Sequence, residues 1–130
     1  MVVDTSALMA ILLEEHDGAV FARKLEQSRS AVISSASFTE AGIMALKRTA
    51  QSDASAVHRL IEQADIRVEP LDETQARFAI EAYARFGRGT GHPARLNFGD
   101  CFSYALAKAR NEPLLFKGND FARTDIRSAL

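Results

Sequence analysis

Short apolar segments alternate with amphipathic helical patterns along this chain, and the alternation restricts its fold more than any other feature. Each apolar segment is short enough to be a β-strand; they are residues 1–3, 31–34, 66–69 and 113–116. Strands that alternate with helices favour a parallel sheet covered by helices on both faces. We therefore predict an α/β fold, a three-layer α/β/α sandwich with a central parallel β-sheet.

Apolar residues spaced three or four positions apart mark the helices between these strands. The stripes are Leu8, Ile11 and Leu12; Ala54, Val57, Ile61 and Ala64; Ala76, Ala79, Ile80 and Tyr83; and Phe102, Ala105, Leu106 and Ala109. Each stripe is predicted to face the core. Asp100 lies off the last stripe, on the flank shared with Tyr104 and Ala107, so we expect it to face an edge of the fold.

The composition indicates a single globular domain over residues 1–130, with 47% apolar and 25% charged residues. Cys101 is the only cysteine, which excludes an internal disulfide, and His16, His58 and His92 lack the paired spacing of a zinc site. No apolar run approaches the roughly 18 residues that span a bilayer, and no secretory leader is evident. We expect a cytoplasmic protein that does not associate with a membrane.

Three acidic residues occupy the places where a parallel α/β fold binds its ligands. Asp4 follows the first predicted strand, Glu40 lies one turn into the helix after the second, and Asp100 begins the helix before the fourth. The carboxyl ends of parallel strands share one rim of the sheet. Carboxylates gathered there repel each other unless a cation neutralises them, and a hard divalent ion with oxygen ligands is the usual solution.

Each acid also has a structural explanation. Asp4 is suited to cap the helix that follows it, Ser37 to Glu40 matches a capping box, and the helix dipole favours an acid at Asp100. A non-catalytic binding module, in which the acids only cap helices, is therefore one alternative. An aspartyl-phosphate phosphatase is another, although such enzymes generally place a second aspartate where this chain has Ser6.

Positive charge is local, because the net charge of the whole chain is −1. Residues 85–95 contain Arg85, Arg88 and Arg95 without any acid. We predict that these arginines, together with Lys47 near the end of the Glu40 helix, contact the phosphate backbone of a nucleic acid. A solvated loop is the alternative.

Three segments resemble VapC-type toxins of the PIN-domain family: VVDTSAL at residues 2–8, TEAGIMALKR at 39–48, and HPARLNFGDCFSYALAKARNEPLLFKGNDFARTDI at 92–126. The resemblance extends over essentially the whole chain. It implies a Mg²⁺- or Mn²⁺-dependent endoribonuclease, the toxin of a type II toxin–antitoxin system, with a structured RNA such as tRNA or rRNA as substrate. It also implies homodimers and neutralisation by a cognate VapB-type antitoxin.

The resemblance further implies roles for individual residues. Asp4 and Asp100 correspond to the direct metal ligands, and Ser6 to a small hydroxyl residue after the first acid. We expect Glu40 to orient or deprotonate the attacking water. The fourth acidic position falls on Asp120, and Asn119 stands beside it as a neutral residue where related sequences commonly carry an acid. Because asparagine brings no negative charge, this departure predicts weaker metal affinity.

Overall fold

The computed structural model describes residues 1–48 and 54–130, and its centre is a sheet of four parallel strands. The strands are β1 (Val2–Val3), β2 (Ala31–Ser34), β3 (Ile66–Glu69) and β4 (Leu114–Leu115), in the spatial order β3-β2-β1-β4. All four predicted strands are present, although β1 and β4 are shorter than their apolar segments. The predicted parallel α/β sheet is confirmed.

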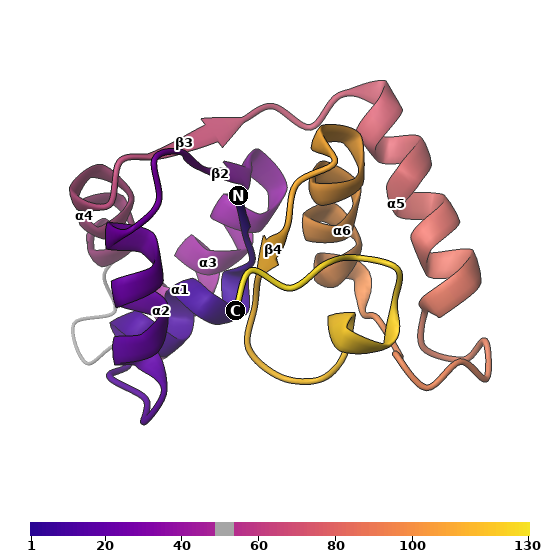
Figure 1. Ribbon diagram of the computed structural model, residues 1–130, viewed down its shortest axis with the longest axis horizontal. Helices are drawn as coiled ribbons and strands as arrows, with labels where there is room; N and C mark the ends of the chain where they lie inside the picture. The colour runs from indigo at the N-terminus through magenta and orange to yellow at the C-terminus, as the bar shows by residue number, and fades with distance from the viewer. Residues whose placement is uncertain (49–53) are drawn as a thin grey trace.

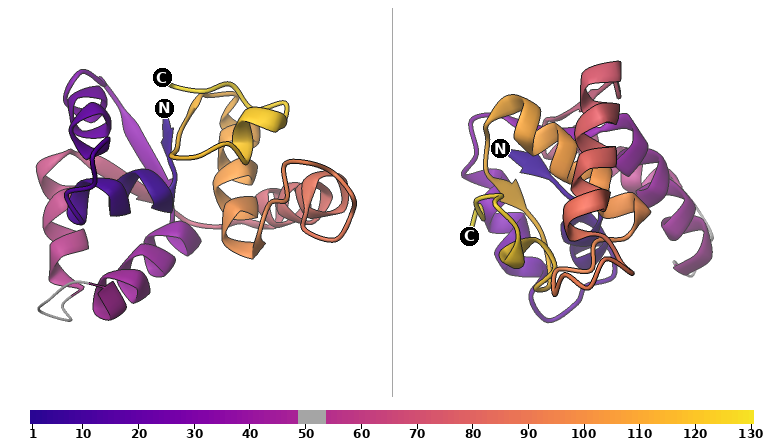
Figure 2. Two further views of the ribbon diagram at one scale, coloured as in Figure 1. Left: turned by 90° about the horizontal axis from the view of Figure 1, so that it is seen from below. Right: turned by 90° about the vertical axis from the view of Figure 1, so that its right-hand side faces the viewer.

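Helices cover both faces of the sheet (Figure 1). They are α1 (Thr5–Leu12), α2 (Gly18–Glu26), α3 (Ser35–Arg48), α4 (Ser55–Gln63), α5 (Glu73–Phe86) and α6 (Phe98–Arg110), with a 3₁₀ helix η1 (Phe121–Arg123) near the carboxyl end. Helices α1 to α4 lie to one side, and α5, α6 and the carboxy-terminal segment to the other (Figures 1 and 2), which confirms the three-layer prediction. No helix in the described residues is long and apolar enough to cross a membrane.

The strands send alternate side chains into two cores, as the pleat of a strand requires. Val2 and Leu114 belong to the core beneath α5 and α6, whereas Val3 and Leu115 belong to the core formed with α1, α2, α3 and α4. All four side chains are fully buried. Strands β1, β2 and β4 are buried at every position, because helices cover both faces. The edge strand β3 is only partly buried, and its Arg67 is exposed.

Helix α6 is buried on nearly all sides, so its predicted stripe is only partly right. Ala105 and Leu106 are buried as expected, but so are Tyr104 and Ala107, and Ala109 is exposed. The reason is tertiary: α6 packs against α5, α3 and the strands β1, β2 and β4 at once. The first turn of α6 is less enclosed, because Asp100 is half-buried.

Helix α5 buries only part of its predicted stripe. Ala79 is buried as expected, and so are Ala82 and Phe86, which lie off the stripe, whereas Ile80 is 72% exposed and Tyr83 is 43% exposed. Small residues on the buried face let α5 lie close to α6. The larger side chains of Ile80 and Tyr83 consequently line an apolar groove on the outside.

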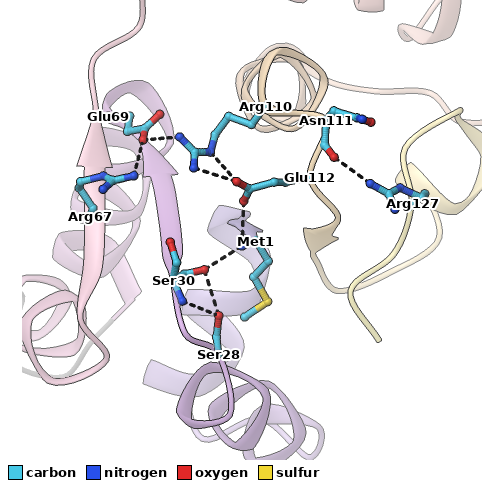
Figure 3. A network of polar contacts seen from close by, with 9 residues as sticks. All are labelled: Met1, Ser28, Ser30, Arg67, Glu69, Arg110, Asn111, Glu112 and Arg127. Atoms are coloured by element: carbon cyan, nitrogen blue, oxygen red, sulfur yellow. Dashed lines mark hydrogen bonds and ion pairs between the residues drawn. The ribbon is translucent and has the colours of Figure 1, made fainter.

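A network of ion pairs holds the carboxyl end of α6 (Figure 3). Arg110 pairs with Glu69 of β3 at 2.7 Å and with Glu112 at 2.8 Å, and Glu112 pairs with the amino group of Met1 at 2.8 Å. Arg67 pairs with the same Glu69 at 2.9 Å. The network thus fixes the end of α6 that lies opposite its acidic first turn.

Candidate active site

The candidate site lies where the strand order reverses. Strands β2 and β3 extend the sheet on one side of β1, and β4 returns to the other side. Asp4 directly follows β1, and its N–H donates to the carbonyl oxygen of Leu115 in β4 at 2.9 Å. In open parallel sheets, the carboxyl ends of the strands at such a reversal form the ligand-binding crevice.

Asp4 caps α1, as predicted, and still offers an oxygen to the site. It is only 3% exposed, and its Oδ2 accepts hydrogen bonds from the N–H of Ser6 at 2.8 Å and from the Ser6 hydroxyl at 2.5 Å. The Ser6 hydroxyl in turn accepts a bond from the N–H of Lys117 at 3.0 Å. Oδ1 of Asp4 accepts no hydrogen bond from the described part of the chain.

Glu40 lies on α3, and the alternative in which Ser37 and Glu40 form a capping box is wrong. Helix α3 begins at Ser35, so Ser37 lies inside it, where its buried hydroxyl hydrogen-bonds with that of Ser103 at 3.0 Å. Oε2 of Glu40 accepts instead from the hydroxyl of Thr5 at 2.8 Å. The carboxylate is thereby directed towards the end of β1.

Asp100 forms a capping box with Asn97 at the start of α6. The N–H of Asn97 donates to Oδ2 of Asp100 at 2.7 Å, and the N–H of Asp100 donates to Oδ1 of Asn97 at 2.9 Å. Asp100 is therefore fixed by hydrogen bonds as well as favoured by the helix dipole. Its Oδ1 accepts no hydrogen bond from residues 1–48 or 54–130.

Four acids share one electrostatic site. Burial raises the pKa of Asp100 to about 7 against the hydrogen bond from Asn97, and the charges of Asp4, Asp120 and Glu40 raise it further. Burial likewise raises the pKa of Glu40. Among the described residues, none of the four acids forms an ion pair with a lysine, arginine or histidine, so their charge is not neutralised by a side chain.

The donor set at this rim fits a hard divalent cation. Asp4 and Asp100 each keep an oxygen without a hydrogen bond, and carboxylate oxygens are the ligands that Mg²⁺ prefers. The one nearby thiol is unsuited, because burial raises the pKa of Cys101 to about 11. In the ranges that the structure describes, no three acidic, histidine or cysteine side chains are grouped closely enough to hold a metal ion alone. A bound ion would thus take further ligands from water or from a substrate phosphate.

The two polar residues predicted from the KGNDF segment differ in their relation to the acids. Asp120 and Asn119 are both exposed in the loop between β4 and η1. Asp120 is close enough to raise the pKa of the aspartate in the first turn of α6. Lys117, in the same loop, pairs with Glu15 and with Asp17 (2.8 Å), which fastens the loop to the turn between α1 and α2.

The basic residues predicted to bind phosphate are placed differently. Arg85 belongs to the last turn of α5, where it pairs with Asp125 at 3.7 Å and lies 4.6 Å from the centre of the Phe86 ring. Arg88 is exposed, forms no ion pair within the described residues, and donates from Nε to the carbonyl oxygen of Arg95 at 3.3 Å. That hydrogen bond and a β-bridge between residues 87 and 96 order the loop.

Lys47 is exposed and lines a groove beside the acids. The groove has a volume of about 540 Å³, and Glu40 and Gly99 lie in its wall with Phe98. Phe98 also borders the apolar groove of α5, which Arg88 lines. The two grooves therefore meet at Phe98, close to the acidic site, with one basic residue in each.

Reasoning from the sequence missed Thr5, Asn97 and Gly99. Asn97 stands three residues before Asp100, the spacing of a capping box, and this signal was available. Gly99 was detectable in part, because glycine inside a helix is unfavourable and marks a close approach. No local pattern pairs Thr5 with Glu40, since 35 positions separate them.

The chain has a parallel sheet with carboxylates at the point where the strand order reverses. The family model for the PIN domain matches residues 1–127. Ribonuclease VapC28 of Mycobacterium tuberculosis is 52% identical over 130 residues, 100% of this chain and 98% of the relative. Ribonuclease VapC42 of the same species is 46% identical over 129 residues, covering 99% and 98%. The chain therefore belongs to the PIN-domain family and, within it, to the VapC ribonucleases, which confirms the resemblance.

Two solved structures share the fold. Mycobacterium tuberculosis VapC20, described as a toxin that cleaves the sarcin–ricin loop, superimposes with a TM-score of 0.77 at 19% identity, over 96% of this chain and 95% of that chain. A toxin–antitoxin complex from Klebsiella pneumoniae gives a TM-score of 0.70 at 14% identity, over 99% and 97%. Both support the three-layer architecture.

Proposed function

We propose that this protein is a metal-dependent endoribonuclease, the toxin of a type II toxin–antitoxin system. The observation that carries the proposal is the acid cluster at the sheet's switch point, with the pKa of Asp100 raised to about 7 and no basic side chain paired with the acids in the described residues. The names of the VapC relatives support ribonuclease activity. A structured RNA such as tRNA or rRNA is the proposed substrate.

Asp4 and Asp100 are the proposed ligands of Mg²⁺, or of Mn²⁺. When bound, the ion would stabilise the negative charge that develops on the phosphodiester during hydrolysis. Ser6 holds the Asp4 carboxylate and Asn97 holds that of Asp100, so both are oriented before substrate arrives. Burial raises the pKa of Glu40, which makes this carboxylate a better proton acceptor for a water that attacks the phosphorus.

The two alternative functions fare differently. In the phosphatase alternative, the second aspartate would stand at Ser6, whose hydroxyl here donates to Asp4 and cannot serve as a general acid. A non-catalytic module is favoured by one observation, because Asp4 and Asp100 do cap α1 and α6. That observation does not account for the unneutralised charge of four acids, and the cleavage experiment separates the two.

The cleavage experiment compares the parent protein with Asp4→Asn. The parent should cut RNA in Mg²⁺ or Mn²⁺ and lose cleavage in excess chelator, because the clustered acids repel phosphate without a cation. Asp4→Asn keeps an oxygen to accept the Ser6 N–H, so the helix cap and the fold should remain. Sequencing of RNA ends after brief induction would identify the cut. Identical ends with both proteins would contradict the proposal.

We further infer an RNA-contacting role for Lys47, Arg88 and Arg95, with Arg85 less available because it already pairs with Asp125. Arg88→Ala should weaken RNA binding and lower the slope of log affinity against log salt by about 0.7, the value for one phosphate contact to a single strand. Arg77→Ala is a matched control, since Arg77 pairs with Glu73 on the exposed side of α5 at 2.6 Å. An unchanged slope for Arg88→Ala would favour the solvated-loop alternative.

Protein partners are proposed as well: a cognate VapB-type antitoxin and a second copy of this chain. The Klebsiella pneumoniae neighbour is a toxin–antitoxin complex, which supports the first. Ile43, Ile80 and Phe98 are 48%, 72% and 76% exposed, and contiguous apolar exposure of this kind marks protein contacts. The cytoplasm, where RNA and antitoxin are made, is the proposed compartment.

A further inference from the structure

We propose that Gly99 and Thr5 are positioning residues that together seat the Glu40 carboxylate on the first turn of α6, next to Asp100. The inference rests on the proposed function, in which Glu40 takes part in RNA cleavage. It concerns two residues that touch Glu40 from different elements, α6 and α1, and that do not themselves need to contact metal or RNA.

Gly99 provides the space that Glu40 occupies. It is the second residue of α6 and is buried, and a Cβ built on it would lie 2.3 Å from Oε1 and 2.6 Å from Oε2 of Glu40. Real Cβ atoms do not approach other heavy atoms so closely, so any other residue here would push the carboxylate away. The backbone gives no separate reason for glycine, because Gly99 is helical and does not have a positive φ.

Thr5 holds the same carboxylate through a hydrogen bond. Its side chain is buried, with 5% exposure, and its hydroxyl lies 2.8 Å from Oε2 of Glu40 and 3.1 Å from the carbonyl oxygen of Ser37. Thr5 directly follows Asp4, so this bond ties Glu40 to the residue next to a proposed metal ligand. Gly99 directly precedes Asp100, and the carboxylate packs against it where a Cβ would stand. The Glu40 carboxylate is thus located relative to both ligands.

Gly99→Ala and Gly42→Ala test the role of Gly99, because both add a methyl group within a helix but only the first places it against Glu40. Gly99→Ala would place a methyl against the Glu40 carboxylate, whereas at Gly42, inside α3, a Cβ meets nothing within 4 Å. Alanine is the better helix former at both positions, and at Gly99 only the end of a flexible side chain must move. We therefore expect both variants to fold, with a Tm at or above that of the parent protein.

Cleavage should separate the two variants. A displacement of about 1 Å in a catalytic group can cost up to about 100-fold in rate, so Gly99→Ala should cleave RNA at least about 10-fold more slowly at saturating Mg²⁺. Gly42→Ala should cleave at the parental rate. RNA affinity, measured separately in chelator, should be the same for both. If Gly99→Ala keeps the parental stability and RNA affinity but loses turnover, a purely structural role of Gly99 does not explain the loss.

Substitutions at Thr5 test the hydrogen bond independently of the helix. Thr5→Val keeps the shape and removes the hydroxyl, so turnover should fall, whereas Thr5→Ser keeps the hydroxyl and should retain most of it. If the methyl group of Thr5 mattered through packing alone, the order of the two variants would be reversed. Because both residues act on one carboxylate, the loss in Thr5→Val combined with Gly99→Ala should be smaller than the product of the single losses.

Glu40→Gln separates the failure of this inference from the failure of the proposed function. Parental cleavage by Glu40→Gln would overturn the role of Glu40 itself. If Glu40→Gln is inactive while Gly99→Ala and Thr5→Val both cleave like the parent, the proposed function stands and the positioning inference is wrong. Should Gly99→Ala fail to fold, the comparison of Thr5→Val with Thr5→Ser decides the question.

Discussion

Asp100→Asn is expected to lower the rate of RNA cleavage by about 100-fold or more, because a bound metal ion contributes several kcal/mol to stabilisation of the transition state. The substitution removes a negative charge that interacts with the charges of Asp4, Glu40 and Asp120. It also removes one of the two proposed metal ligands. It preserves the capping box, because the side-chain oxygen of an asparagine accepts the N–H of Asn97 as a carboxylate does. Cleavage should be measured under single turnover at saturating Mg²⁺, so that weakened binding is not mistaken for slow chemistry.

Asp72→Asn is the matched control for this change. Asp72 caps α5 with a side-chain oxygen that accepts the N–H of Gln75 at 2.8 Å, but it is not among the acids that act on Asp100. The same chemical change at a second helix cap should leave cleavage at the parental rate. Equal rates for the parent and Asp100→Asn would show that this acid only caps its helix, as the non-catalytic alternative holds.

Strands β1, β2 and β4 were predictable because they are short segments buried on both faces. Segments such as residues 31–34 are continuous, short and bounded by helical patterns, and few other structures accommodate them. The helix faces were less predictable. In α5, both the pair Ala82 and Phe86 and the pair Ile80 and Tyr83 fit a helical period, and only the close approach to α6 determines which pair is buried.

The acid cluster was predictable for a topological reason, since residues at the carboxyl ends of parallel strands converge whatever their separation in sequence. The contacts that orient each acid were not. A capping box with Ser37 was the alternative for Glu40, yet the carboxylate bonds to Thr5, and a solvated loop was the alternative for Arg85, yet this residue pairs with Asp125. Such pairs depend on how separate segments of the chain pack together, which the periodicity within one segment does not contain.

The stability of the metal-free protein should fall as the pH rises from about 4 to about 7. The pKa of Asp100 is raised by burial to about 7 from an ordinary value of 3.8, so in this window the folded protein keeps a proton that the unfolded chain has released. Binding more protons in the folded state makes stability decrease with rising pH. The raised pKa of Glu40 acts in the same direction. Because solvent screens this half-buried site, we expect a loss on the order of 2–4 kcal/mol, less than the full shift would give.

Acids with a lowered pKa make the stability of the folded protein fall at low pH. The pKa of Asp125 is lowered because bonds from Lys108 and Tyr104 outweigh its burial, and this contribution is lost as the pH falls below the ordinary range of an aspartate. The greatest stability is therefore expected near the pH at which these acids are ionised and Asp100 is still protonated. Urea unfolding in chelator across this range would measure it, and a flat curve between about pH 4 and 7 would contradict the raised pKa of Asp100.

Mg²⁺ should restore the stability that the metal-free protein loses as the pH rises, and it should do so only at a pH at which the acids are ionised. Metal ligands must be deprotonated, so at a free concentration near 100 times its dissociation constant the ion should stabilise the protein by about 2.7 kcal/mol above pH 7 and by much less near pH 5. Asp100→Asn should flatten the fall in stability and abolish most of the Mg²⁺ effect, because it removes both the titrating group and a ligand. Asp72→Asn should leave both intact. If Mg²⁺ stabilises Asp100→Asn as much as the parent, the ion binds elsewhere, and the acids at the end of β1 and the start of α6 lose their proposed role.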